Sequence, residues 1–424
     1  MSSRNFMEKL LDGIDVEWKS LGEIGDFVRG KRFVKTDMIS EGKPCIHYGE
    51  MYTHYGIWAN ETKSFVDEEL ASKLRVASHG DIIIVAAGET VEDIGNGTAW
   101  LGKNDVVIHD ACFAYKSKLD PKYVSYYLRT SHFKEQIKKN ISSGKISAIN
   151  ANGLSKAIIP IPCSENPEKS LKIQTKIVRI LDAFTELTTE LTNELTNELT
   201  ARKKQYNYYR DQLLSFKEGE VEWKTLGEVT EKIYSGGTPK TSISEYWDNG
   251  TIPWMSSGEV NLETIYKTEK YISESGLKNS SAKFVPKNSI VIALAGQGKT
   301  RGKVARTRIN LTTNQSLASL IFDDKIINPD YVYHFLRTQY ENLRQISSGG
   351  GTRGGLNLSM ISSYKLPVPS LEKQLHIVSI LDKFDALTNS ISDGLPHEIK
   401  LRQKQYEYYR DLLLSFPKPE EVAI

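Results

Sequence analysis

The chain has 424 residues, which is too long for one ordinary hydrophobic core and predicts at least two domains. Its 39% hydrophobic and 25% charged residues exclude a largely disordered chain. Because 55 basic residues nearly balance 53 acidic ones, the net charge of +2 does not by itself indicate nucleic-acid binding, although it leaves room for local basic patches.

The sequence also predicts where in the cell the protein is located. Its first residues lack the apolar segment of a signal peptide, and the longest apolar run, 82–87, is far shorter than the roughly 20 residues of a membrane span. Cys45, Cys112 and Cys163 are odd in number and widely spaced, which favours neither a disulfide framework nor a zinc site. We therefore expect a cytoplasmic protein with no membrane partner and no metal.

A tandem duplication organises the chain. Residues 17–24, Glu-Trp-Lys-Ser-Leu-Gly-Glu-Ile, return as residues 222–229, Glu-Trp-Lys-Thr-Leu-Gly-Glu-Val. Residues 205–216 match residues 405–416 at ten of twelve positions, and the offset between the copies stays between 200 and 208. Since solenoid repeats are much shorter, this period indicates two duplicated domains.

Each copy begins with a globular part that mixes strands and helices, which predicts an α+β fold of roughly 150 residues. Apolar runs closed by glycine are typical of buried strands, and Asp-Pro or Asn-Pro is typical of a capped helix start. These features recur in both copies: strands at 81–88 and 289–296, helices at 120–128 and 328–336, and proline-bounded extended segments at 158–162 and 366–369.

A long helix follows each globular part. Apolar residues at steps of three and four over 173–191 and 377–391 predict a coiled-coil seam. In both copies the shared glutamine lies 21 positions after the shared phenylalanine, so we expect the two helices to pack side by side, antiparallel, in a pseudo-two-fold arrangement. Gly394 and Pro396 predict that the second helix is kinked or divided.

The first helix carries a Thr-Asn-Glu-Leu repeat within residues 187–199. Four residues turn a helix by about 400° and lengthen it by about 6 Å, so the leucines drift around the helix. This pattern favours a spacer. An ordinary dimerising coiled coil, the alternative, would keep a strict heptad.

The order of these elements resembles the specificity subunit of Type I restriction–modification enzymes over almost the whole chain. The motifs that carry the resemblance are Glu-Trp-Lys-Thr-Leu-Gly-Glu-Val at 222–229, Ser-Gly-Gly-Thr-Pro-Lys at 235–240, Ile-Pro-Trp-Met-Ser-Ser-Gly at 252–258, Gly-Leu-Pro at 394–396 and Gln-Tyr-Glu-Tyr-Tyr-Arg at 405–410. Each motif is weak alone, whereas their order and duplication are specific.

The resemblance implies a non-catalytic DNA-recognition subunit that binds a bipartite, asymmetric site in double-stranded DNA. It also implies two methyltransferase partners docked on the helices, translocase and endonuclease subunits, and S-adenosylmethionine, ATP and magnesium bound by partner subunits with no cofactor here. The expected segments are a first target-recognition domain at 1–165, a central spacer helix at 166–216, a second target-recognition domain at 217–370 and a C-terminal spacer helix at 371–424.

Basic residues in glycine-rich turns are the candidates for DNA contacts, because phosphates and guanine both favour that chemistry. The expected DNA-binding residues are Arg29, Lys31, Arg32, Lys35, Lys145, Lys240, Lys299, Arg301, Lys303, Arg306, Thr352 and Arg353. The expected partner-binding residues on the helices are Tyr206, Tyr209, Arg210, Tyr406, Tyr409 and Arg410. The plainer alternatives are solvated surface for the cations and core packing for the tyrosines, as for Trp247 and Trp254.

Two other functions remain as alternatives. Residues 293–300 fit a permissive phosphate-loop pattern, but Gly302 and the β-branched continuation favour a β-hairpin with a basic tip over an ATPase loop. A scaffold that presents two domains to protein or glycan ligands is the second alternative. Steep salt dependence of binding would distinguish a DNA reader from such a scaffold.

Overall fold

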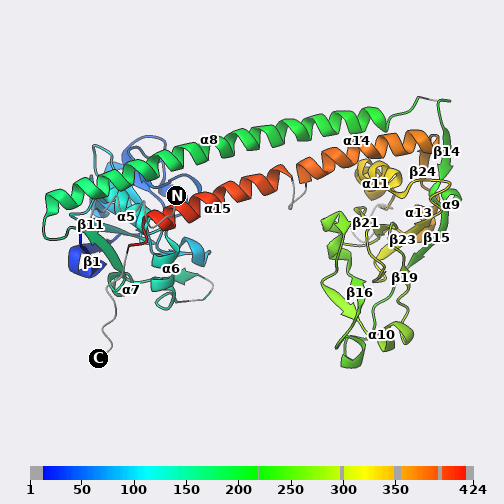
Figure 1. Ribbon diagram of the computed structural model, residues 1–424, viewed down its shortest axis with the longest axis horizontal. Coiled ribbons are helices and arrows are strands. Elements are labelled where there is room, and N and C mark those ends of the chain that lie inside the picture. Colours follow the sequence, from blue (N-terminus) through cyan, green and yellow to red (C-terminus); the bar gives the residue numbers. More distant parts are fainter. Residues whose placement is uncertain are drawn as a thin grey trace. The chain divides into compact units, whose positions relative to one another are not determined.

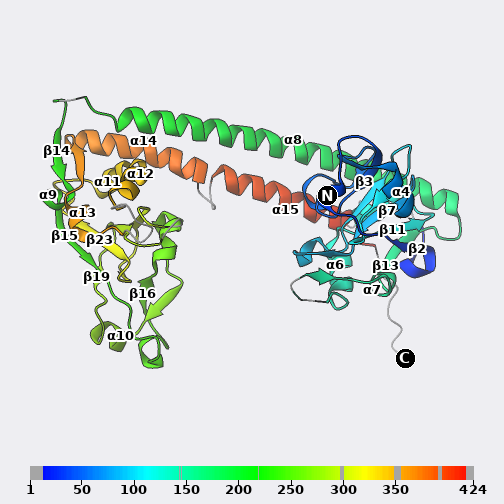
Figure 2. The same cartoon turned by 180° about the vertical axis from the view of Figure 1, so that it is seen from behind.

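The computed structural model describes residues 13–142, 144, 146–217, 219–296, 300–347, 355–389 and 394–416. The chain forms two compact units, seen from opposite sides in Figures 1 and 2. Unit 1 comprises Met1–Leu195 and Ile399–Ile424, and unit 2 comprises Thr196–Glu398. The four consecutive segments expected from the sequence therefore differ from the compact units, because each unit takes helical segments from both halves of the chain.

Unit 1 contains two main sheets. The five-stranded sheet has the order β2 (Gly25–Arg29), β11 (Cys112–Ser117), β7 (Ile82–Val85), β9 (Gly97–Trp100) and β4 (Trp58–Ala59). The four-stranded sheet has the order β5 (Ser64–Val66), β3 (Lys43–Ile46), β10 (Val106–Ile108) and β6 (Val76–Ala77). The predicted apolar strand is β7, whose four residues are all buried.

Further short pairings close the unit 1 domain. Strand β1 (Val16–Ser20) pairs antiparallel with β13 (Ile158–Pro162), which confirms the predicted extended segment. Strand β8 (Ala87–Gly88) pairs with β12 (Ser147–Ala148). The helices of the domain are α2 (Leu21–Ile24), α3 (Glu50–Thr53), α4 (Glu68–Lys73), α5 (Pro121–Tyr127), α6 (Ser131–Lys138) and α7 (Ala151–Ser155), with 3-10 turns η1 (Lys35–Asp37) and η2 (Val91–Asp93).

Unit 2 repeats this topology. Its five-stranded sheet has the order β15 (Thr230–Ser235), β23 (Leu317–Phe322), β20 (Ile290–Ala293), β21 (Val304–Thr307) and β17 (Thr264–Ile265). Its four-stranded sheet has the order β18 (Lys270–Ile272), β16 (Ile252–Met255), β22 (Leu311–Thr313) and β19 (Phe284–Val285). Strand β14 (Glu222–Thr225) pairs antiparallel with β24 (Lys365–Val368). The helices of this domain are α9 (Leu226–Val229), α10 (Glu274–Lys278), α11 (Pro329–Thr338), α12 (Tyr340–Ile346) and α13 (Leu358–Ser362), with 3-10 turns η3 (Ser244–Tyr246) and η4 (Ser257–Leu262).

The predicted capped helices are α5 and α11, and both caps form as expected. Asp120 accepts the backbone N–H groups of two first-turn residues of α5, and Asn328 does the same for α11. In both, a proline occupies the first turn, where a missing N–H costs nothing. A buried glutamine of the following long helix, Gln174 or Gln374, accepts the cap residue's own N–H. These repeated bonds fix each long helix to its domain.

The first long helix is continuous and the second is divided. Helix α8 (Pro167–Leu213) has 47 residues, a length of about 70 Å at 1.5 Å per residue. The second helix is α14 (Leu371–Asn389) followed by α15 (Leu395–Leu413), so the predicted division at Gly394 and Pro396 is confirmed. Pro396 lies in the first turn of α15, where proline is tolerated.

Within each unit, helical segments from the two copies pack together. In unit 1, Phe184 of α8 stacks on Tyr409 of α15 at a centroid distance of 5.7 Å, and the hydroxyls of Thr185 and Tyr406 lie 3.0 Å apart. Residue numbers rise along α8 as they fall along α15, so this pair is antiparallel. Figures 1 and 2 show the two helices running along each other there. In unit 2, Tyr209 of α8 stacks on Phe384 of α14 at 5.8 Å.

The cores follow the same division. The main core of unit 1 includes Leu413, Leu414 and Phe416, and the core of unit 2 includes Tyr206 from α8 and Leu214, which directly follows α8. The apolar residues of the long helices therefore pack within one chain, as the antiparallel prediction required. None of the helices in the described ranges combines the length and apolar character needed to cross a membrane.

Candidate nucleic-acid interface

A cavity of about 490 Å³ opens in the unit 1 domain beside the ends of strands β2, β3 and β10. Its polar and aromatic lining includes Arg29, Arg32, Phe33, Lys35, His47, Tyr48, Glu89, His109 and Asp110. Three of the four predicted cations that the structure describes in this domain therefore line one cavity. The fourth, Lys31, is exposed, and its ammonium donates to the backbone oxygen of Lys73 at 2.8 Å.

The floor of this cavity is aromatic. Strands β3 and β10 are parallel neighbours, so the residues that follow them, His47 and His109, lie side by side with ring centroids 4.5 Å apart. Tyr48 and Phe33 pack against the ring of His109 at 5.1 Å and 5.2 Å. Burial lowers the pKa of both histidines, and a charge on His109 would lower that of His47 further. In the described part of the chain, no group of histidine, cysteine and acidic residues has the geometry to hold a metal ion.

The rim of the cavity is cationic. Arg32 and Lys35 are exposed, and the Nε of exposed Arg29 donates to the backbone oxygen of Asp110 at 2.9 Å. A ring of cations around a largely buried aromatic floor offers charge for phosphates and donors for base edges.

The predicted cations of the unit 2 domain that lie within the described residues have separate surroundings. Lys240 is exposed in the loop after β15, where the backbone N–H of Gly237 donates to the oxygen of Thr313 at 2.9 Å. The ammonium of Lys303 donates to Asn261 at 2.7 Å, and Arg301 is half-buried.

Arg306 differs from the surface cation that the sequence suggested. It is 7% exposed, and its guanidinium lies 2.6 Å from Asp382, 3.1 Å from Asp330 and 3.5 Å from Asp385. It also lies over the ring of Tyr333 at 4.7 Å. The residue therefore joins the domain to helix α14 and does not offer a charge to DNA. Its position inside strand β21, which the basic run of the sequence concealed, explains the difference.

Four predicted DNA contacts, Lys145, Lys299, Thr352 and Arg353, lie outside the described residues. The strands that flank residues 293–300, β20 and β21, pair antiparallel from Ile290–Arg306 to Ile292–Val304, as the hairpin interpretation requires. Trp254 is buried with its indole N–H on the oxygen of Gly237, and Trp247 packs edge-on against it at 5.1 Å, so both are packing residues.

The polar residues at strand ends are the part of the candidate site that sequence reasoning did not single out. His47, His109, Ser256 and Asn314 are not among the predicted DNA-binding residues. Their proximity depends on the parallel pairings β3 with β10 and β16 with β22, which join residues about 60 positions apart. The sequence signals this proximity only through two short apolar strands, about 60 residues apart, that are each followed by a polar residue.

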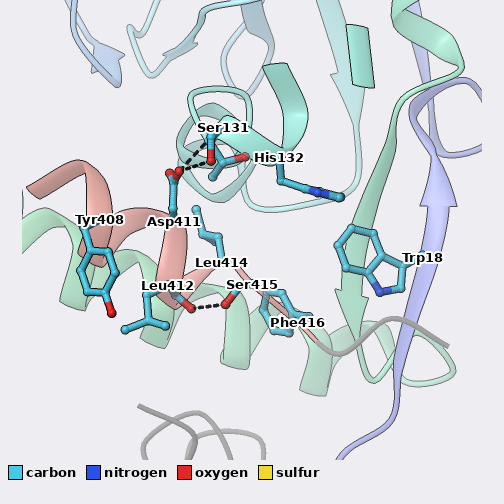
Figure 3. Close-up of a pocket in the computed structure, with 10 residues that line it drawn as sticks. Trp18, Ser131, His132, Tyr408, Asp411, Leu412, Leu414, Ser415 and Phe416 are labelled. Carbon is cyan, nitrogen blue, oxygen red and sulfur yellow. Dashed lines mark hydrogen bonds between the residues drawn. The ribbon is translucent and has the colours of Figure 1, made fainter. Parts of the chain in front are cut away.

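A second kind of candidate surface lies where α15 meets the unit 1 domain (Figure 3). The carboxylate of Asp411 accepts the backbone N–H of Ser131 at 3.0 Å and the hydroxyl of the same residue, which fixes α15 to the start of α6. A pocket of about 290 Å³ lies beside this contact and is lined by Trp18, Tyr408, Leu412, Leu414 and Phe416, among others. The equivalent pocket in unit 2, of about 570 Å³, is lined by Asp211, Leu214, Phe216 and Trp223, among others.

The predicted partner-binding residues divide into two groups. Tyr206 is 6% exposed and packs against Phe384, and Tyr406 contacts Thr185, so these two tyrosines hold the helices of one chain together. Arg210 and Arg410 each pair with the next aspartate, at 2.7 Å and 2.8 Å.

The remaining tyrosines keep an exposed edge. Tyr209 and Tyr409 stack on a phenylalanine of the neighbouring helix and stay partly accessible. Tyr208 and Tyr408, which are 63% and 62% exposed on the long helices, were not in the predicted set. They occupy equivalent places in the two units.

Comparisons with known proteins agree with this geometry. The family model described as Type I restriction modification DNA specificity domain matches residues 14–201 and again residues 218–401. The specificity subunit of the type I restriction enzyme EcoR124I/EcoR124II from Escherichia coli is 41% identical over 433 residues, covering 100% of both chains. The specificity subunit of the type I restriction enzyme EcoprrI, also from Escherichia coli, is 33% identical over 414 residues, covering 93% of each.

Solved structures show the same fold. A chain from a structure of complex assembly and conformational transition in the type I R-M system has a TM-score of 0.64 at 15% identity, covering 94% of this chain and 97% of that one. The HsdS subunit from Thermoanaerobacter tengcongensis has a TM-score of 0.51 at 15% identity, covering 94% and 95%. The predicted fold class, two duplicated α+β domains with long helices, is confirmed.

Proposed function

We propose that this chain, which belongs to the family of Type I restriction modification DNA specificity domains, reads DNA sequence for a restriction–modification complex. The observation that carries the proposal is the cationic cavity of the unit 1 domain, with Arg29, Arg32 and Lys35 around an aromatic floor. The chain is the recognition subunit, and the chemistry belongs to other subunits of the complex. The family match favours this function over a scaffold for protein or glycan ligands.

The recognised site is bipartite and asymmetric. Both domains have the same strand order, so they present the same edges to a ligand. Their side chains differ at those edges, so each domain reads a different half-site, with helix α8 setting the distance between the halves.

The partners are two copies of a methyltransferase subunit. The exposed tyrosines Tyr208 and Tyr408 recur at equivalent positions of the two units, and such a repeat fits one partner bound twice. Exposed aromatic side chains are enriched where proteins dock. A translocating endonuclease subunit completes the complex. S-adenosylmethionine, ATP and magnesium are bound by these subunits.

Two measurements test the proposal. Fluorescence anisotropy of the purified chain with duplex DNA should show affinity that falls steeply with salt, on the order of 1,000-fold between about 50 mM and about 200 mM if about six phosphates are contacted. Methylome sequencing of cells that express the chain with its methyltransferase should show one asymmetric bipartite motif. Salt-insensitive binding, or a methylation pattern without a bipartite motif, would contradict the proposal.

A further inference from the structure

The two domains place different polar side chains on the same backbone frame, and we propose that these side chains read the bases of the two half-sites. The positions are the residues that follow the two parallel strands of each four-stranded sheet: His47, Tyr48, His109 and Asp110 in unit 1, and Ser256, Ser257, Asn314 and Gln315 in unit 2. The inference rests on the proposed DNA recognition and assigns it to particular side chains.

Strand pairing makes these positions equivalent. Ile46 of β3 lies beside Ile108 of β10, and Met255 of β16 lies beside Thr313 of β22, both in parallel register. Because parallel strands end at the same edge of a sheet, the next residues of both strands lie close together there. Apart from these pairs and the β4–β9 and β17–β21 pairs, the strand pairs within the described residues are antiparallel.

A buried glutamate holds the first strand end in each domain. In unit 1 the carboxylate of Glu50 accepts the backbone N–H of His47 at 3.0 Å. In unit 2 the carboxylate of Glu259 accepts the backbone N–H of Ser256 at 2.7 Å. In both copies a buried glutamate thus accepts the N–H of the residue that follows the first parallel strand, so this contact belongs to the backbone arrangement that the two domains share.

A glycine brings the neighbouring loop onto the second strand end. A Cβ added to Gly30 would lie 2.2 Å from the backbone oxygen of His109, and one added to Gly236 would lie 1.9 Å from that of Thr313. Only glycine permits so close an approach. The loops that carry Arg32 in unit 1 and Lys240 in unit 2 are therefore held against the strand ends in the same way.

The side chains on this frame have different hydrogen-bonding chemistry. In unit 1, Nδ1 of His47 accepts the N–H of Gly49 at 3.2 Å, so the neutral ring carries its proton on Nε2 as a donor. In unit 2, Oε1 of Gln315 accepts the hydroxyl of Thr238 at 2.6 Å, which leaves the amide nitrogen as a donor. At these positions unit 1 thus carries two buried imidazoles, a phenol and a carboxylate, whereas unit 2 carries hydroxyls and amides.

This division matches what sequence reading requires. Each base pair presents its own pattern of donors and acceptors in the major groove, and amide side chains pair well with adenine, whereas basic donors pair well with guanine. Phosphate contacts carry no sequence information and suit the surrounding cations Arg32, Lys35 and Lys240. A duplicated fold that keeps its frame and changes these side chains reads two unlike half-sites.

Substitutions in each domain test the assignment in the full chain. The pair His109→Asn and Asp110→Gln gives the second strand end of unit 1 the side chains found there in unit 2, and Gln315→Ala removes an exposed side chain from unit 2. Methylome sequencing should show altered bases in one half-site for the first variant and in the other half-site for the second. Anisotropy on the original site should show a loss on the order of 10- to 100-fold, with unchanged affinity for unrelated duplex.

The matched control is Arg32→Ala, which should weaken binding to all duplexes alike and reduce the salt slope by about 1. Thermal denaturation checks that each variant is folded, and Gln315→Ala alters only an exposed side chain. If the folded variants keep both half-sites, the assignment of these readers is wrong while salt-dependent DNA binding stands. If the wild-type chain shows no sequence-specific binding, the proposed function itself fails.

Discussion

Arg306 shows how one buried cation can join a domain to a helix. Its three aspartates come from α11 and α14, and Arg337 extends the network through Asp385 at 3.0 Å and Glu263 at 2.8 Å. In unit 1 the equivalent helix aspartate, Asp182, instead accepts Lys122 and the hydroxyl of Tyr126. The two domains are thus fixed to their helices by different chemistry at the same position.

Removing this cation should destabilise unit 2. In Arg306→Met three carboxylates lose their shared partner, and breaking a buried ion pair from one side costs about 3–5 kcal/mol. Hydrogen-exchange mass spectrometry of β21 and α14 in urea should report the loss, with unit 1 unchanged. The control Lys240→Met alters an exposed cation of the same domain and should leave stability intact. Equal unfolding of both variants would argue against the role given to Arg306.

Asp382 makes this stability depend on pH. Burial alone would raise the pKa of Asp382, but hydrogen bonds from His334 and Arg306 lower it to about 2. Since the folded pKa is below the unfolded value of about 3.9, the carboxylate's contribution is complete above that value and is lost as pH falls towards 2. Acid unfolding of unit 2, followed by circular dichroism, should be steeper between these pH values in the wild type than in Asp382→Asn. Identical slopes would show that Asp382 does not contribute to the pH dependence of stability.

At the scale of elements, much was predictable from the sequence. Glycine-closed apolar runs, Asp-Pro and Asn-Pro caps and a proline in the second helix each act locally, so they identified β7, β20, α5, α11 and the start of α15. Parallel pairs between short strands depend on contacts about 60 residues apart, which no local pattern encodes. For the same reason the proximity of the strand-end residues and the burial of Arg306 were not predicted.

The Thr-Asn-Glu-Leu repeat offers a test of the spacer role of α8. Deleting residues 192–195 removes about 6 Å and a rotation of about 400° from the helix. With a DNA rise of about 3.4 Å per base pair, the recognised spacer should shorten by one or two base pairs, read by methylome sequencing. A variant with Asn193→Ala and Asn197→Ala keeps the length and should keep the spacer. If the deletion variant recognises a spacer of unchanged length, the spacer role proposed for α8 is wrong.

At the scale of the whole molecule, the duplication predicts modular specificity. Replacing residues 17–165 with the equivalent domain of a relative should change one half-site of the methylated motif and leave the other intact. Replacing residues 222–370 should have the converse effect. The exchanged domain must keep its own helix contacts, because Asp182 and Asp382 have different partners. Simultaneous changes in both half-sites would contradict independent reading.

The composition of the units has a consequence for biosynthesis. Unit 2 is built from one uninterrupted segment, Thr196–Glu398, so every residue it needs has been translated before the last helix is finished. The N-terminal part of unit 1 is translated first, but its core is complete only after Leu413, Leu414 and Phe416 have been synthesised. The domain that is translated first is therefore the one that matures last, and a nascent chain that stalls late exposes the apolar surface of its own N-terminal domain to chaperones and proteases.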